Sequence, residues 1–424
     1  MGAAPATTFQ RPYRHLAVRT FNGAGRLLRT MGLRRSLCAE SILQSAIRQT
    51  GLADWGSDES FREGLERLVQ SCEEDCRLTP LGRMLLRLAF VQHARTRLRL
   101  QEWIRKEPSV LNEEIRRPLF VVGYPRTGTS LLHNLLCQDR GGRPLLLWEA
   151  LEPVPPPEFP LGLEDPRVDR ARWLVSLSRR YIMPQMTTIH PLEAEGPEEC
   201  TFLLFNTFRT PAYTLMGDVG GYLQWLRDRG DRDRLPVYEE YRRQLQLLQW
   251  RRPGRYWILK SPLHLWGLDA LLRLFPDALV VQTHRDMSKV IASTWSLKAV
   301  SRAMYSDHID CRRMRNELPD YYHDFHVPLT RARADHPRRV FDVHYRDLIQ
   351  DPLAAVRSIQ EHFGMTPDTG MEERLRRWVA HHPANKHGTH RYDLAQFGLT
   401  GADIEKLYGD YHEQYGIKPE AASA

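Results

Sequence analysis

The sequence predicts an α/β protein with a parallel sheet flanked by helices, a helical N-terminal region and a helical insertion. From Pro118 onward, short apolar or β-branched runs such as LFVVG, YWILK, ALVVQT and RVFDVHY are each followed by a helical pattern, and this alternation is typical of a parallel sheet. Before that point, apolar residues recur at helical spacing. We therefore expect a helical region over residues 1–115 that packs on an α/β domain over residues 116–424, with residues 151–252 forming a mainly helical insertion.

The composition is that of a globular protein. The 424 residues are 42% hydrophobic and 26% charged, and apolar runs such as Leu119–Val122 are much shorter than the roughly 18 residues that a transmembrane helix needs. The formal net charge of +8 arises from 60 basic and 52 acidic side chains. Residues 1–39 hold seven arginines and no acid, which leaves 53 basic against 52 acidic side chains elsewhere. This nearly neutral body argues against a nucleic-acid partner.

The arginine-rich start of the chain has three interpretations. It could be an organelle-targeting segment or a peripheral contact with an anionic membrane. The third interpretation, which we favour, is an amphipathic helix around GRLLRTMGLRRSL that docks on the body. Six cysteines without a secretory signal indicate a reducing compartment, so we expect a cytoplasmic protein unless the N-terminus directs it to an organelle. Nothing in the sequence predicts an oligomeric state.

Two of the six cysteines, Cys72 and Cys76, lie four residues apart on an expected helix. Such a pair could bind a metal, but no matching Cys or His pair lies nearby. We therefore expect buried thiols at these positions.

A glycine-bracketed loop follows the first expected strand. Residues Gly123 to Ser130 read GYPRTGTS, which resembles the phosphate-binding loop G-x-x-x-x-G-K-[ST] with Thr129 in place of its lysine. At the carboxyl end of a strand, the backbone N–H groups of Thr127–Ser130 would point at an anion, reinforced by the dipole of the next helix. Because the lysine that reaches the β- and γ-phosphates is absent and Arg126 places a charge earlier, we expect a P-loop-like site for a shorter phosphate chain, without a metal ion.

The stretch FVVGYPRTGTSLLHNLL resembles the 5′-phosphosulfate loop of sulfotransferases that use 3′-phosphoadenosine 5′-phosphosulfate (PAPS), especially the bacterial-type branch whose loop reads PRTGT. The family has a second signature, a strand ending in Arg with Ser eight residues later, and ALVVQTHRDMSKVIAS matches it at Arg285 and Ser293. The resemblance implies that these two residues bind the 3′-phosphate. It implies in addition that the 5′-phosphosulfate is held by Arg126, Thr127, Gly128, Thr129 and Ser130.

Three further stretches resemble segments of the same family. YWILKSPLHL is similar to the family's middle strand, which implies that Lys260 faces the donor. VHYRDLIQDP is similar to the segment whose tyrosine, here Tyr345, lies against the adenine. ANKHGTHRYDLAQFGL looks like the C-terminal loop that closes over the 3′-phosphate, here through Lys386, Gly388 and Arg391. The chain departs from the cytosolic members where Arg126 replaces a lysine and Leu131 replaces a tryptophan, so adenine must rely on other contacts.

The resemblance implies an enzyme that moves a sulfuryl group from PAPS to a hydroxyl of a small-molecule, glycan or lipid acceptor. Arg126 and Lys260 would stabilise charge on the leaving phosphate, as in phosphoryl transfer. The base that accepts the hydroxyl proton is either Glu149 in LLLWEALEP or His264 in KSPLHL. Histidine titrates near neutral pH, whereas Glu149 occupies the place where related enzymes put a catalytic glutamate, and we favour Glu149.

Two other functions remain open at this stage. A small-molecule kinase using ATP would need the missing lysine and a Mg²⁺-binding carboxylate after a strand, and neither is evident. A nucleotide-binding protein without catalytic activity has no sequence feature against it. The insertion contains the aromatic-rich stretch CTFLLFNTFRTPAYTLM, which suits an apolar alcohol or phenol as acceptor, although such stripes form core more often.

Overall fold

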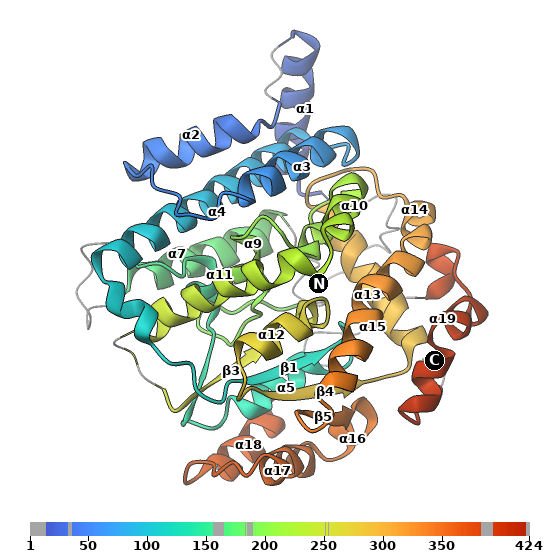
Figure 1. Ribbon diagram of the computed structural model, residues 1–424. Helices are drawn as coiled ribbons and strands as arrows, with labels where there is room; N and C mark the ends of the chain where they lie inside the picture. The colour runs from blue at the N-terminus through green and yellow to red at the C-terminus, as the bar shows by residue number, and fades with distance from the viewer. Residues whose placement is uncertain are drawn as a thin grey trace.

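A five-stranded parallel sheet forms the centre of the α/β part (Figure 1). The computed structural model describes residues 14–32, 36–155, 165–182, 184, 190–250, 252, 254–382 and 393–420. The strands are β1 (Leu119–Gly123), β2 (Gly142–Pro144), β3 (Tyr256–Lys260), β4 (Leu279–His284) and β5 (Val340–His344). Their order across the sheet is β2-β3-β1-β4-β5. The central position of β1 places the loop that follows it between the ends of β3 and β4.

Helices cover both faces of the sheet. They are α5 (Thr129–Leu136), α12 (Leu268–Leu274), α13 (Met287–Ala303), α14 (Cys311–Asn316), α15 (Leu318–Asp335), α16 (Tyr345–Gln350), α17 (Pro352–His362), α18 (Met371–His381) and α19 (Gly401–Gln414), with the short 3-10 helices η4 (Pro262–Leu265) and η5 (Leu394–Phe397). Alternate residues of β1 point to opposite faces. Phe120 and Val122 join the core under α12, α13 and α15, whereas Leu119 and Val121 pack with residues of α5, α17 and α18. All four side chains are fully buried, as expected for a parallel sheet covered on both sides.

The regular elements of the described chain before β1 are all helices. Its helices are α1 (Leu16–Thr30), α2 (Ala39–Thr50), α3 (Phe61–Glu74), α4 (Pro80–Lys106) and the 3-10 helix η1 (Pro108–Asn112). The segment between β2 and β3 adds α6 (Leu147–Leu151), α7 (Pro166–Leu177), the π-helical turn η2 (Ser178–Ile182), α9 (Thr201–Phe205), η3 (Pro211–Leu215), α10 (Gly220–Arg229) and α11 (Asp231–Gln249). A second core joins the two groups, with Phe90 of α4 packed edge-on against Phe208 and Tyr213.

The α/β class with a parallel sheet, predicted from the alternation of strand and helix patterns, is confirmed. β1 and β3 coincide with LFVVG and YWILK, and β4 begins one residue later than expected and ends at His284. β2 was not predicted, because its three residues at the sheet edge contain no apolar run. The division into a region over 1–115 and a domain over 116–424 stays a prediction. Among the described residues, no helix combines the length and the apolar character that a membrane crossing requires.

Candidate active site

The loop between β1 and α5 adopts unusual backbone conformations. Gly123 and Gly128 have φ angles of 143° and 94°, which favour glycine because it has no Cβ. Arg126 also has a positive φ, 71°, an uncommon conformation for other residues that clusters at functional sites. A Cβ added to Gly128 would lie 2.9 Å from Cδ2 of Tyr345. The Tyr345 ring therefore lies directly against the loop.

Three hydroxyl residues line the turn into α5. Thr127 is fully buried, and its hydroxyl donates to the carbonyl oxygen of Tyr124 at 2.7 Å, which fixes the loop. Thr129 is the first residue of α5 and is buried, whereas Ser130 is exposed. The first N–H groups of a helix have no partner within the helix and favour anions. The turn can therefore hold an anionic group from the exposed side.

Lys260 connects this turn to the insertion. It ends β3, and its Nζ donates to Oγ of Ser130 at 3.3 Å and to Oε1 of Glu199 at 2.7 Å. The side chain of Glu199 is 20% exposed, and its second oxygen accepts from the Thr201 hydroxyl at 3.0 Å. The backbone N–H of Cys200 donates to the carbonyl oxygen of Lys260 at 2.9 Å and so ties this segment to the end of β3. A buried ammonium thus stands between the loop and a carboxylate.

The two residues of the second signature lie at opposite ends of Arg126. Its Nε donates to Oγ of Ser293 in α13 at 3.0 Å, and its carbonyl oxygen accepts from Nη1 of Arg285 at 3.0 Å. Asp286 orients this region, because its Oδ1 accepts from the N–H of Ser288 and caps α13. Arg126, Arg285 and Ser293 therefore converge, as the signature required.

Arg285 already holds an anionic group from the chain itself. Its Nε and Nη2 donate to the two carboxylate oxygens of Glu420 at 2.7 and 2.8 Å. The guanidinium lies over the ring of Tyr345 at 4.0 Å from the centroid, and the backbone N–H of Glu420 donates to Oδ2 of Asp286 at 2.9 Å. A bidentate carboxylate on a stacked arginine indicates a site suited to a carboxylate or phosphate.

The side chains of the two predicted bases pair with residues outside the loop. Glu149 in α6 is buried, and its Oε1 accepts from Nη2 of Arg143 at 2.8 Å. The Arg143 guanidinium itself stacks on Trp257 at 4.3 Å. His264 in η4 is fully buried, and its Nδ1 lies 3.0 Å from the hydroxyl of Tyr238. Burial lowers the pKa of His264 to about 3. Neither side chain lines the cavity described below, and their surroundings suit structural roles.

A second acidic residue lies beside Glu199. Oε1 of Glu198 is 3.2 Å from Nε2 of His190. Burial alone would raise the pKa of Glu198, but the charge and hydrogen bond of His190 outweigh it and lower that pKa to about 2. Although burial opposes it, the pKa of His190 is raised by the same carboxylate. One ligand atom from each of His190, Glu198 and Glu199 lies within 4.8 Å of the others, a spacing that a metal ion could use.

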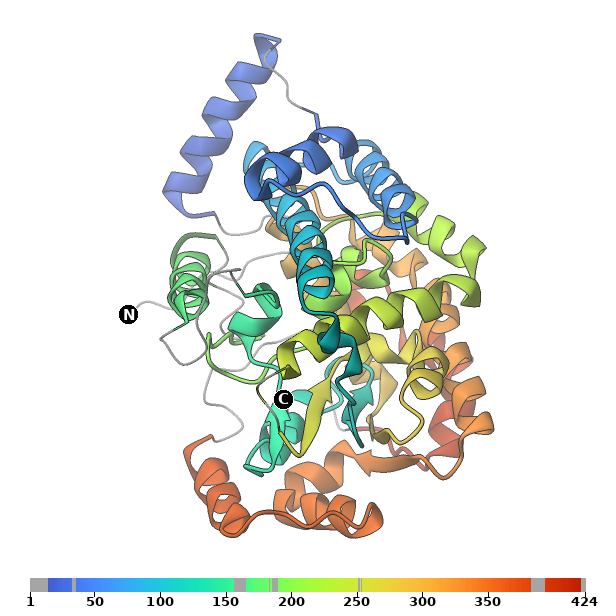
Figure 2. The ribbon, with the colours of Figure 1, turned by 60° about the vertical axis from the view of Figure 1, so that its left-hand side comes forward.

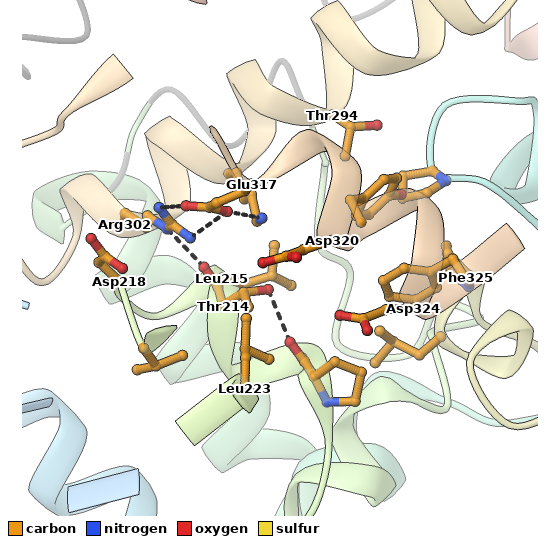
Figure 3. Close-up of a pocket in the computed structure, with 18 of the residues that line it drawn as sticks. Thr214, Leu215, Asp218, Leu223, Thr294, Arg302, Glu317, Asp320, Asp324 and Phe325 are labelled. Atoms are coloured by element: carbon orange, nitrogen blue, oxygen red, sulfur yellow. Dashed lines mark hydrogen bonds and ion pairs between the residues drawn. The ribbon is translucent and has the colours of Figure 1, made fainter. Parts of the chain in front are cut away.

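A cavity of about 290 Å³ begins at Glu199 and Pro125 of the loop and extends between α10, α13 and α15. Its apolar lining is Pro211, Ala212, Leu215, Val219, Leu223, Pro262, Leu263, Leu297, Tyr321 and Phe325. Figure 3 shows Arg302 paired with Glu317 on one side of the cavity and Asp324 beside Phe325 on the other. The Asp324 carboxylate accepts from Nε of Arg227 at 2.9 Å. Charged side chains in the wall are therefore paired with one another.

Three residues predicted to close over the 3′-phosphate, Lys386, Gly388 and Arg391, lie outside the described residues. Sequence reasoning missed Glu199 and Glu420. The stretch GPEECT offers two adjacent glutamates with nothing to separate them, and only the pairing of Cys200 with the end of β3 brings Glu199 to Lys260. Glu420 lies in a short polar tail that matched no motif. No sequence signal could have found either contact.

These features define a class of protein in which a phosphate-binding loop after the first strand meets basic residues from two neighbouring strands. Residues 118–369 match the model of the Sulfotransferase family. The chain is 31% identical to the sulfotransferase STF1 from Mycobacterium tuberculosis, whose crystal structure aligns over 88% of this chain and 99% of that one with a TM-score of 0.76. The sulfotransferase STF9 from Mycobacterium avium aligns over 91% of this chain and 98% of its own, at 30% identity and a TM-score of 0.79.

A relative of described activity is more distant. The omega-hydroxy-beta-dihydromenaquinone-9 sulfotransferase Stf3 from Mycobacterium bovis is 26% identical over 320 residues, which cover 70% of this chain and 75% of Stf3. The chain belongs to the Sulfotransferase family and is a transferase of sulfuryl groups. Members of this family generally use PAPS as the donor. The resemblance predicted from the loop is thereby confirmed at the level of family and activity.

Proposed function

We propose that this chain transfers a sulfuryl group from PAPS to the hydroxyl of an uncharged, largely apolar acceptor. The observation that supports the donor most directly is the Arg285 guanidinium, which holds a carboxylate while it stacks on Tyr345 next to Gly128. A nucleotide 3′-phosphate offers the same bidentate chemistry in place of the carboxylate. Lys260 and the turn at Ser130 would receive the 5′-phosphosulfate. Family membership argues against the ATP-dependent kinase that the sequence left open.

The proposal includes no metal ion at the donor site. The side chains that contact the loop from neighbouring strands, Lys260 and Arg285, are basic. The nearby carboxylates of Glu199 and Glu420 are each paired with one of them. Lys260 and Arg126 would supply the positive charge that a metal supplies in other phosphate-transfer sites. Activity that resists EDTA would support this part of the proposal.

We propose Glu199 as the base in place of Glu149 and His264. Its carboxylate is partly exposed, lines the cavity and lies 2.7 Å from the ammonium of Lys260. Glu199 would accept the hydroxyl proton while the acceptor oxygen forms a bond to sulfur. The bond between sulfur and the phosphate oxygen breaks, and adenosine 3′,5′-bisphosphate leaves with the electron pair. Lys260 would stabilise the charge on that phosphate.

The lining of the cavity supports an apolar acceptor. Most of the wall surface that faces the cavity is apolar, although polar residues are slightly more numerous in the lining. The charged side chains pair with one another, as Glu317 does with Arg302 and Lys298. A charged acceptor would have to break such a pair, which is costly in a buried place. The lipid-like acceptor named for the relative Stf3 is of the same class. An alcohol or quinol with a long apolar body is therefore the acceptor class that we propose.

The decisive experiment is a Glu199→Gln variant assayed with labelled PAPS and long-chain alcohols or quinols. We expect kcat to fall about 10²–10⁴-fold, the usual contribution of a positioned base. Binding of adenosine 3′,5′-bisphosphate should be kept or tightened, because Lys260 loses a competing carboxylate. Glu193→Gln, an exposed glutamate of the same segment, is the control and should retain full activity. Unchanged turnover in Glu199→Gln would contradict this choice of base.

The donor is tested separately by thermal shift. Adenosine 3′,5′-bisphosphate should stabilise the protein by about 2.7 kcal/mol at a hundredfold excess over its Kd, without metal. Stabilisation by ATP and Mg²⁺ alone would contradict the donor. We also keep the expectation of a reducing, cytoplasmic location, which the six free cysteines support.

A further inference from the structure

Helix α1 docks on the body through its small and polar residues. Its buried side chains are Val18 and Asn22, and Oδ1 of Asn22 accepts from the N–H of Leu81 in α4 at 2.9 Å. Gly25 lies so close to Pro80 that an added Cβ would be 2.5 Å from the Pro80 Cβ. Figure 2 shows α1 at the edge of the molecule, away from the sheet. The side of α1 that meets the protein is therefore its less apolar side.

The apolar residues of α1 point outward instead. The exposed fractions are 71% for Leu16, 45% for Phe21, 64% for Leu27, 48% for Leu28 and 67% for Met31 at the helix end. At about 100° per residue these five positions fall within an arc of roughly 140°, separate from Val18, Asn22 and Gly25. A helix that docks only to cover its apolar face would be turned the other way. We call these five residues the α1 patch.

A neighbouring helix exposes further apolar side chains. η2, the turn that follows α7, packs against α1 through Tyr181 and His15, whose rings meet edge-on at 5.0 Å. Trp173 and Leu174 of α7 are 63% and 43% exposed. Of the twelve large hydrophobic side chains that are exposed in the described residues, seven therefore belong to the α1 patch or to α7. Such clustering, unlike scattered exposure, marks an interaction surface.

The charges around the α1 patch favour one partner. Arg19 lies nearest to the apolar arc, whereas Arg26 and Arg29 lie on the other side of the helix, and all three are exposed. Arg26 pairs with Asp307 at 3.3 Å, and α1 itself carries no acid. An apolar stripe on a helix whose only charged side chains are arginines is the pattern of a helix that lies in the surface of an anionic membrane. A second copy of this chain would present the same arginines and would repel the first. Trp173 of α7 is exposed, and tryptophan is typical of membrane interfaces.

We propose that the α1 patch, with Trp173, docks the enzyme on an anionic lipid surface, with α1 parallel to the membrane plane. The contact requires neither the proposed donor nor the proposed base, because it uses none of their residues. It would keep the cavity near a source of apolar alcohols. α1 includes the first part of the amphipathic helix expected around residues 25–37, and residues 33–35 lie outside the described residues. The interpretation that we favoured, docking on the body, and the alternative of membrane contact would involve opposite sides of this helix.

The test is flotation of the purified full chain with vesicles of phosphatidylcholine alone or mixed equally with phosphatidylglycerol. We expect binding to the mixed vesicles that weakens at least tenfold between low salt and 0.5 M salt, because salt screens the arginines. Leu16→Ser with Leu27→Ser should weaken it at least tenfold, and Arg19→Gln with Arg29→Gln should remove the preference for anionic lipid. Leu111→Ser, which changes an exposed leucine on η1 outside the α1 patch, is the control and should bind as the parent does.

Each other outcome overturns the proposal. Failure of the parent chain to bind anionic vesicles would exclude a lipid surface. Equal loss of binding in Leu111→Ser and in the Leu16/Leu27 variant would show that binding does not depend on the α1 patch. A concentration-dependent dimer in light scattering, abolished by the Leu16/Leu27 variant without lipid, would identify a second copy as the partner. Circular dichroism and activity on a short-chain acceptor confirm that each variant is folded.

Discussion

The contact between Glu420 and Arg285 should compete with the donor, and this can be measured. If Arg285 binds the 3′-phosphate, the carboxylate of Glu420 must leave before the nucleotide can use that position, since both of its oxygens accept from the same guanidinium. Glu420→Gln keeps the size of the side chain but removes its charge. We therefore expect the variant to bind adenosine 3′,5′-bisphosphate more tightly than the parent.

The size of the effect follows from the geometry of the pair. Two charge-assisted hydrogen bonds are strong, about 1.5–3 kcal/mol each where solvent is excluded. Here 14% of the Arg285 side chain and 33% of the Glu420 side chain remain exposed, and ordering the tail costs about 1–2 kcal/mol per residue. A net contribution of about 1 kcal/mol, the upper end for a solvent-accessible pair, is reasonable. The Glu420 carboxylate would then occupy Arg285 about 85% of the time and weaken the binding of adenosine 3′,5′-bisphosphate about 6-fold.

Isothermal titration with two nucleotides tests this directly. Adenosine 3′,5′-bisphosphate should bind Glu420→Gln about 3–10-fold more tightly than the parent, whereas adenosine 5′-phosphate, which lacks the competing group, should bind both alike. Glu413→Gln, an exposed acid in α19, should change neither affinity. If Arg285→Ala weakens both nucleotides equally, Arg285 is not the 3′-phosphate ligand. An unchanged affinity in Glu420→Gln would show that the tail does not compete.

Three further variants test the roles assigned to buried and loop residues. Glu149→Gln should lower the free energy of unfolding in urea by about 1–3 kcal/mol, because Arg143 loses its charged partner in a buried place. The folded fraction of this variant should keep the parental kcat. A lower kcat at full stability would restore Glu149 as the base. His264 stays neutral when folded because burial lowers its pKa to about 3. Between pH 6.5 and pH 3 only the unfolded chain takes up this proton, so the free energy of unfolding decreases as the pH is lowered. His264→Gln should remove up to about 1.4 kcal/mol per pH unit from that slope, and a slope equal to that of the parent would refute the assignment. Gly128→Ala should weaken adenosine 3′,5′-bisphosphate at least tenfold, since its φ of 94° and the Tyr345 ring leave no room for a Cβ; parental affinity would mean that the loop can shift freely.

Most of the sheet could be predicted because buried parallel strands consist of apolar or β-branched runs. β1, β3 and β4 are such runs, and each was located to within one residue. β2 could not be predicted, because Gly142–Pro144 is a short edge strand defined by pairing with β3 rather than by its own side chains. The local sequence pattern predicts strands whose own residues are apolar enough to be buried. It misses strands that are defined only by their hydrogen bonds to a neighbouring strand.

The same limit applies to the site. Arg126 and Arg285 could be found because they follow strands, where a parallel sheet gathers its ligands, and Ser293 was found through the resemblance to the family's second signature. Glu199 has no such signature and reaches the loop only through its contact with Lys260. His264 looked like a base from its type alone, but the fold buries it against Tyr238. Whether a titratable side chain can exchange protons depends on burial, which the sequence does not give. The catalytic and binding roles of all these residues stay predictions.

The ion pair between Lys260 and Glu199 links the two halves of the proposed reaction. Lys260 contacts the turn at Ser130 on one side and Glu199 on the other, at 3.3 and 2.7 Å. An anion bound at the turn would draw the ammonium towards itself, and Glu199 would then be available to accept a hydrogen bond from a hydroxyl in the cavity. Without that anion the Glu199 carboxylate stays paired with Lys260 and would bind the hydroxyl of an acceptor less well. In the proposed reaction, one buried lysine would thus couple donor binding to the release of the base, without a separate moving element.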